Sequence, residues 1–263
     1  MMRFAPALSV LVAALTAAGA AAEPTIPDYI VASIAGPDRP AQQVQLDRWR
    51  KPAEVIAFAD LKPGDRIADF MPGNGYFTRI FSRVVGPKGR VYAFLPAQEL
   101  ANCAPEETAG TRALEGDRRY ANVQLMIDAT DRFEVPERLD MVWTAQNYHD
   151  LHDKFMAPTD IARLNAAIFR ALKPGGVFLI IDHVAAPSAG LRDTESLHRI
   201  EPDVIVSEVT AAGFRLEAES EVLRNPDDSH LLAVFDPAIR HRTDQVVLKF
   251  RRPASTVASG GSE

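Results

Sequence analysis

The sequence contains a single cysteine, Cys103, and therefore cannot form an internal disulfide. One thiol supplies no framework of bridges, so the cysteine content says nothing about the redox compartment. The 263 residues carry 29 basic and 35 acidic side chains, for a net charge of −6, and no basic tract stands out. Because binding to a nucleic-acid backbone requires clustered positive charge, the composition predicts no nucleic-acid partner.

Several catalytic patterns are missing as well. The sequence has no Gly-x-Ser-x-Gly, so it lacks the usual setting of a serine nucleophile. Gly86-Pro-Lys-Gly89 has neither the spacing nor the Ser/Thr of a phosphate-binding P-loop. His149, Asp150 and His152 are spaced so that they could be interpreted as metal ligands, but no cysteine or second His-rich segment supports that alternative. We therefore predict no metal site from the sequence.

The N-terminus has the pattern of a secretory leader. Met1-Met2-Arg3 is a short positive region, an apolar stretch follows over 4–19, and Ala20-Ala21-Ala22 provides a small-x-small cleavage pattern. The alternative, a membrane anchor, would need about 20 apolar residues and firmer flanks. We expect a signal peptide over 1–22, no membrane span after its removal, and an exported, periplasmic protein.

The most informative stretch runs from Arg66 to Phe81. An apolar segment ending in Asp69 predicts a buried parallel strand over 66–71. Pro72-Gly-Asn-Gly75 breaks the strand, because proline removes a donor and glycine permits positive φ. The next apolar residues follow the spacing of one helix face and are Phe77, Ile80, Phe81 and Val84. A strand, a glycine turn and a helix N-terminus together place backbone N–H groups where a ligand can bind them.

Strand and helix patterns then alternate along the chain. The expected strands are 66–71, 90–95, 122–127, 139–145, 176–182, 214–222 and 245–251. This order predicts an α/β, Rossmann-like sheet of seven strands, mostly parallel with only the last antiparallel, and helices on both faces. We expect 66–71 in the interior of the sheet. The predicted organisation is a helical lead-in over 23–51, one domain over 52–253 and a disordered tail over 254–263.

These motifs resemble those of class I S-adenosylmethionine-dependent methyltransferases. The glycine turn is similar to their first motif, and Leu172-Lys-Pro-Gly-Gly followed by an apolar strand is among their most recognisable passages. The resemblance implies S-adenosylmethionine as the cofactor. In that fold an N-terminal segment often lies over the ligand cleft; the alternative, which we favour here, is that Trp49 packs this segment onto the domain surface. The positions expected to contact the cofactor are Asp69, Pro72, Gly73, Asn74, Gly75, Asp128, Ala129 and Asn147.

Within this superfamily the chain resembles the exported methyltransferases most. They share Pro-Gly-x-Gly in the turn, and their later Asp-His and Leu-His-Arg are similar to Asp182-His183 and 197–199 here. Two positions depart from the superfamily pattern. Met71 replaces the first glycine of the turn, and Leu95 stands where an acid usually binds the ribose hydroxyls, with Glu99 as the nearest acid.

The expected activity is methyl transfer to a small-molecule acceptor of unknown identity. Methyl transfer from a sulfonium is an in-line displacement, so the protein mainly aligns donor and acceptor. The candidate catalytic residues are His149, Asp182 and His183, because a histidine can accept a proton near neutral pH and a carboxylate can orient it. The alternative is an exported methyltransferase-like protein that binds a ligand or partner without methyl transfer.

Overall fold

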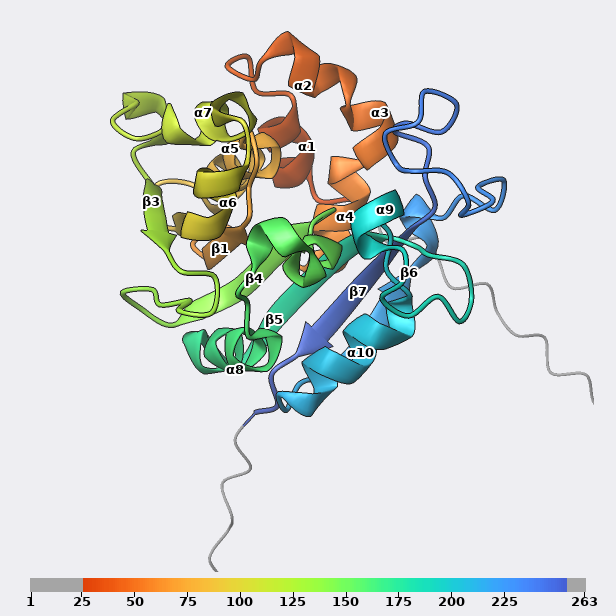
Figure 1. Ribbon diagram of the computed structural model, residues 1–263. Helices are drawn as coiled ribbons and strands as arrows, with labels where there is room; N and C mark the ends of the chain where they lie inside the picture. Colours follow the sequence, from red (N-terminus) through yellow and green to blue (C-terminus); the bar gives the residue numbers. More distant parts are fainter. Residues whose placement is uncertain (1–25, 255–263) are drawn as a thin grey trace, which may run out of the picture.

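The computed structural model describes residues 26–254 (Figure 1). The predicted signal peptide over 1–22, the first residues of the lead-in and nearly all of the predicted tail lie outside the described residues. Within 26–254, no helix is both long and apolar enough to cross a membrane. The boundary that we place between residues 51 and 52 stays a prediction.

The seven predicted strands form one sheet in the order β3-β2-β1-β4-β5-β7-β6. Strands β1 to β5 pair in parallel, whereas β7 runs antiparallel to both β5 and β6. The fold prediction is therefore confirmed, including the interior position of β1. The strands are β1 (Arg66–Phe70), β2 (Arg90–Pro96), β3 (Val123–Asp128), β4 (Leu139–Ala145), β5 (Leu172–His183), β6 (Arg215–Ser220) and β7 (Gln245–Arg251).

Strand β5 begins four residues earlier than the sequence predicts. Leu172 pairs with Leu139, and the register shifts before the regular pairing resumes at Met141 and Val177. The backbone of Gly176 also accepts a hydrogen bond from Arg252 at 2.9 Å. Partners on both sides thus hold the Lys-Pro-Gly-Gly segment in the sheet, although its residues are poor strand formers.

Helices cover both faces of the sheet, as predicted (Figure 1). On one face α8 and α10 pack Leu164 and Ile205 against the strands. On the other face α1, α4 and α5 pack around Trp143 of β4. The helices are α1 (Asp28–Ile34), α2 (Ala41–Gln45), α3 (Asp47–Arg50), α4 (Pro52–Ala59), α5 (Tyr76–Val85), α6 (Ala97–Asn102), α7 (Pro105–Arg112), α8 (Ile161–Ala171), α9 (Thr194–Leu197) and α10 (Pro202–Ala211).

Helix α5 has the apolar face that its spacing predicts. Phe77, Ile80, Phe81 and Val84 are all buried. Phe77 and Phe81 contact the ring of Trp143, with centroid distances of 4.9 and 5.0 Å. This aromatic packing fixes the helix behind β1 and β4, so the N-terminus of α5 is held at the carboxyl end of β1.

Candidate functional site

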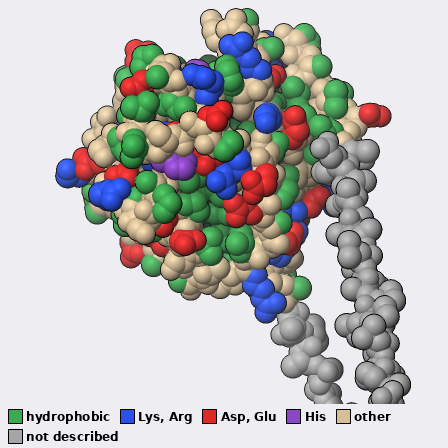
Figure 2. Space-filling view, turned by 90° about the vertical axis from the view of Figure 1, so that its right-hand side faces the viewer, with side chains coloured by type: hydrophobic (Ala, Val, Ile, Leu, Met, Phe, Trp, Pro, Cys, Tyr) green, Lys and Arg blue, Asp and Glu red, His purple; other side chains and the backbone are tan. Residues whose placement is uncertain are grey.

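A cavity of about 950 Å³ opens at the carboxyl ends of β1, β4 and β5. Helices α2 and α3 form part of its wall, as the resemblance predicts, and Arg50 at the end of α3 reaches into it. The glycine turn lies on one side of the cavity, and three histidines lie on another. Seen from the side in Figure 2, Lys and Arg side chains are interspersed with Asp and Glu rather than gathered in one basic patch.

The glycine turn has the left-handed backbone that its composition predicts. Met71, Gly73 and Gly75 have φ values of 57°, 50° and 72°. Met71 thus adopts a conformation that glycine adopts more easily, at the position where the superfamily has its first glycine. Pro72, Gly73 and Asn74 line the cavity.

Gly75, unlike Gly73, is surrounded by other residues of the protein rather than facing the cavity. A Cβ atom there would lie 2.9 Å from both Arg79 and Thr111, so the glycine permits close packing beneath the turn. Gly75 is not among the residues that line the cavity.

Helix α7 holds the glycine turn in place. Asn74 accepts a hydrogen bond from the backbone of Gly110 at 2.6 Å and donates one to the carbonyl of Glu106 at 2.9 Å. The Thr111 hydroxyl donates to the carbonyl of Gly73 at 2.7 Å. A side chain at Gly110 would have its Cβ 2.6 Å from the Asn74 carbonyl oxygen. The turn is therefore pre-organised by contacts that the sequence does not reveal.

Asp69 is the penultimate residue of β1 and lines the cavity. The Thr78 hydroxyl donates a 2.6 Å hydrogen bond to its carboxylate. Burial raises the pKa of Asp69 to about 7, although Thr78 and the positive charge of Arg50 oppose that rise. A buried acid with a pKa near neutrality, in a cleft, has the properties of a functional residue.

Asp128 and Ala129, both expected to contact the cofactor, do not line the cavity. Asp128 is half exposed, accepts a hydrogen bond from the backbone of Ala129 at 2.7 Å and lies 3.4 Å from Arg132. Asn147, by contrast, does line it. Its side-chain amide donates to the carbonyl of Met71 at 2.7 Å, which links the end of β4 to the glycine turn.

Leu95 and Glu99 differ sharply in their positions. Leu95 is completely buried and does not line the cavity. Glu99, on α6, lines it, is 7% exposed, and its Oε2 has no hydrogen-bond partner among the described residues. Burial, together with the negative charges of Asp150, Glu107 and Asp69, raises the pKa of Glu99 to about 7. The carboxylate inside the cavity therefore lies four residues beyond the position that the motif indicates, on α6 rather than in β2.

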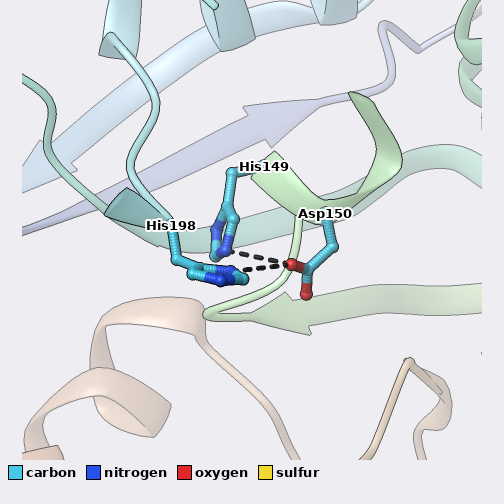
Figure 3. Close-up of side chains that lie close together, drawn as sticks. All are labelled: His149, Asp150 and His198. Atoms are coloured by element: carbon cyan, nitrogen blue, oxygen red, sulfur yellow. Dashed lines mark ion pairs between the residues drawn. The ribbon is translucent and has the colours of Figure 1, made fainter. Parts of the chain in front are cut away.

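His149 is fixed by Asp182, as the sequence suggests. Its Nδ1 donates to Asp182 at 2.7 Å, and its backbone N–H donates to the same carboxylate at 2.8 Å. Nε2 lies 3.1 Å from Asp150, and His198 lies 3.5 Å from the same Asp150 oxygen (Figure 3). Burial lowers the pKa of His149, but Asp182 and Asp150 together raise it well above the ordinary value. Asp182 itself is fully buried behind the ring.

His183 lines the cavity in a different electrostatic state. Its Nδ1 is hydrogen-bonded to the Thr243 hydroxyl at 2.8 Å. Burial lowers the pKa of His183 to about 3, so its imidazole stays neutral at physiological pH. A neutral buried ring bonded to a hydroxyl fits a positioning role better than a proton-accepting one.

Sequence reasoning did not assign Glu99 or His198 to the site. His198 comes from the end of α9 and has a φ of 55°, so its ring reaches the cavity only because the chain turns there. No spacing rule connects it with His149. His152, which the sequence offers as a metal ligand with His149, instead lies 3.3 Å from Glu208.

Comparisons with known proteins agree with this geometry. The ubiquinone/menaquinone biosynthesis C-methyltransferase of Vibrio cholerae is 27% identical over 190 residues, which cover 70% of this chain and 67% of that protein. The 2-phytyl-1,4-naphtoquinone methyltransferase of Synechococcus elongatus is 30% identical over 152 residues, or 57% of this chain and 58% of that protein. No protein-family model matches the sequence.

A solved structure shows the same fold. The S-adenosylmethionine-dependent methyltransferase of Aquifex aeolicus superposes with a TM-score of 0.55 over 84% of this chain and 97% of that one, at 18% identity. The fold and the relatives together indicate that the protein is a class I methyltransferase, and they support S-adenosylmethionine as its cofactor.

Proposed function

We propose that the protein transfers a methyl group from S-adenosylmethionine to a small acceptor with an apolar portion. The observation that carries this proposal is the arrangement of one cavity. The glycine turn and Glu99 lie on the side that we assign to the methyl donor. His149, Asp150 and His198 lie on the side that we assign to the methyl acceptor. Both sets of groups belong to the described part of the chain. The cavity volume of about 950 Å³ would be shared by the cofactor and a small acceptor.

The donor side supplies charges of both signs. Arg50 is half-buried over the ring of Tyr76, with 4.5 Å between guanidinium and ring centroid, and lines the cavity near Asp69. We assign Arg50 to the carboxylate of the methionine moiety, beside the backbone of Gly73. We assign Glu99 to the ribose hydroxyls, in place of the missing acid at residue 95. A carboxylate that accepts two hydroxyl hydrogen bonds gains about 1.5–3 kcal/mol from each.

The acceptor side combines His149 with an apolar rim. Val234 and Phe235 line the cavity, and the rings of Phe235 and His198 lie 4.9 Å apart. Phe235 is 59% exposed, and Leu231, four residues before it in the chain, is 70% exposed. An acceptor with an apolar tail or ring would cover this rim. The quinone methyltransferases among the relatives make a quinol-like acceptor the first class to test.

In this proposal His149 contacts the acceptor and Asp182 is a positioning residue. Methyl transfer needs the acceptor atom, the methyl carbon and the sulfur in line, so a fixed ring contributes by orientation. Asp182 fixes that ring through two hydrogen bonds, one to the side chain and one to the backbone of the same residue.

Transfer of a radiolabelled methyl group tests the function. The full-length protein would be incubated with methyl-labelled S-adenosylmethionine and reduced naphthoquinones and benzoquinones of increasing tail length. We expect label in the organic extract, with a higher rate for longer tails. Phe235→Ser should reduce that dependence on tail length, whereas Phe58→Ser, remote from the rim on α4, should not. Cofactor binding without transfer to any acceptor of the panel would favour the alternative, a binding protein that does not methylate.

A further inference from the structure

Three side chains near the acceptor side meet with donor atoms turned toward one another (Figure 3). They are His149, Asp150 and His198, and one ligand atom from each lies within 4.8 Å of the other two. His149 and Asp150 follow β4, whereas His198 follows α9, so two separate segments contribute. All three line the cavity. A cluster of this kind is either an ion-pair network or a cation site, and a metal titration distinguishes the two.

The spacing matches a metal coordination sphere. Nitrogen and oxygen ligands lie about 2.0–2.2 Å from zinc, so neighbouring ligand atoms in a tetrahedral site are about 3.4 Å apart. The Asp150 oxygen lies 3.1 Å from Nε2 of His149 and 3.5 Å from Nδ1 of His198. Both separations agree with that value. Two imidazoles and one carboxylate form a common ligand set of catalytic zinc and non-haem iron sites.

The surroundings complete the pattern expected around a metal. A histidine ligand usually donates its other ring nitrogen to a carboxylate, which fixes the ring and its tautomer. His149 does so, because Nδ1 donates to the buried Asp182 at 2.7 Å and leaves Nε2 directed at Asp150. Asp153, three residues after Asp150, is 2% exposed, and neither of its carboxylate oxygens has a hydrogen-bond partner among the described residues.

We propose that His149 Nε2, His198 Nδ1 and Asp150 bind a divalent transition-metal ion of the zinc type. Three protein ligands leave at least one coordination position, and that position faces the cavity. Its role rests on the proposed function: an acceptor oxygen would bind there, and the ion would lower its pKa and align it with the methyl donor. The binding of the cation itself does not depend on methyl transfer.

Metal titration of the full-length protein tests the proposal without cofactor or acceptor. The protein would be stripped with a chelator, dialysed, and titrated with Co²⁺ by absorption and with Zn²⁺ by calorimetry. Mg²⁺ serves as the hard-cation comparison. We expect one Co²⁺ per chain with visible bands of low-coordinate cobalt, displacement by Zn²⁺, and no response to Mg²⁺ under the same conditions.

Two asparagine variants form a matched pair. His198 and His241 both have left-handed backbone, with φ values of 55° and 66°, and asparagine tolerates that conformation. His198→Asn removes a ligand, whereas His241→Asn removes an exposed histidine outside the cavity. We expect His198→Asn to weaken Zn²⁺ binding by more than about 100-fold and His241→Asn to leave it unchanged. Asp182→Asn should weaken Zn²⁺ binding by about 10–100-fold, because it removes the carboxylate that holds the His149 ring.

Two results would overturn the proposed cation site. Absence of stoichiometric Co²⁺ binding, or equal effects of His198→Asn and His241→Asn, would overturn the cation site. If a thermal melt shows that His198→Asn does not fold, Asp150→Asn decides in its place. Calorimetry with S-adenosylmethionine on the stripped protein distinguishes the two proposals: cofactor binding without metal binding refutes the cation site alone.

Discussion

Replacing Glu99 by glutamine should stabilise the protein and weaken its cofactor site at the same time. The pKa of Glu99 is raised to about 7 from an ordinary value of 4.5, mainly by burial. A raised carboxyl pKa means that the folded state favours the protonated form. The resulting stabilisation is fully present below the unfolded-state pKa and is lost as the pH rises through about 7. Above pH 7 the wild-type protein holds a buried charge that Glu99→Gln removes.

The size of the effect follows from the shift. At about 1.4 kcal/mol per pKa unit, the change from 4.5 to about 7 corresponds to an upper limit of roughly 3 kcal/mol at pH 8. A domain of this size gains about 2–4 °C in Tm per kcal/mol, so Glu99→Gln should melt up to about 10 °C higher than wild type. At pH 4.5 and below the two proteins should melt at similar temperatures. Glu115→Gln, at an exposed position, is the matched control and should leave the melting temperature unchanged at both pH values.

Cofactor affinity should move in the opposite direction. Exchanging a charge-assisted hydrogen-bond acceptor for a neutral one should weaken S-adenosylmethionine by about tenfold at pH 8. Melting curves at pH 4.5 and 8, with calorimetric titrations at pH 8, measure both effects. Equal melting temperatures of Glu99→Gln and wild type at both pH values would refute the electrostatic argument. An unchanged affinity would refute the assignment of Glu99 to the ribose.

Three further predictions concern the turn, the second strand and the leader. Gly110→Ala would place a Cβ 2.6 Å from the Asn74 carbonyl oxygen, so cofactor affinity should fall at least tenfold while circular dichroism shows a folded protein. Because Gly110 lies within α7 and has no positive φ, alanine adds no backbone strain there, and the effect reports the contact with Asn74. Leu95→Asp should lower the free energy of unfolding by several kcal/mol, which a urea titration measures, because this side chain is fully buried. It should not tighten cofactor binding, because Leu95 does not line the cavity. Tighter binding would contradict our placement of the ribose. We also propose export with removal of residues 1–22, which mass spectrometry of the protein from a bacterial host checks: a product that keeps Met1 or Met2 would contradict it.

Much of the fold could be predicted because local patterns and burial agree. The apolar run before Asp69, the glycine turn and the spacing of Phe77 and Ile80 all indicate one strand-turn-helix unit. The strand order then follows from the alternation of elements and the resemblance. The start of β5 was predicted too late, because pairing partners hold Lys173-Pro-Gly-Gly176 in the sheet despite its composition.

The site was only partly predictable from the sequence. Residues at or soon after the carboxyl ends of strands, such as Asp69 and His149, reach the cavity because parallel strands end at one edge. Glu99 and His198 could not be assigned in this way. Glu99 enters through the orientation of α6, and His198 enters through a left-handed residue at the end of α9. Both depend on tertiary packing that no local spacing encodes.

Calorimetric titration of the purified protein with S-adenosylmethionine and S-adenosylhomocysteine tests the central claim most directly. We expect one site for each ligand, with mutual competition and a lower affinity in Glu99→Gln. An Arg50→Met variant should weaken binding further, because it removes the half-buried positive charge assigned to the carboxylate of the methionine moiety. A folded wild-type protein that binds neither ligand at millimolar concentration would contradict the assignment of this cavity to a methyl donor.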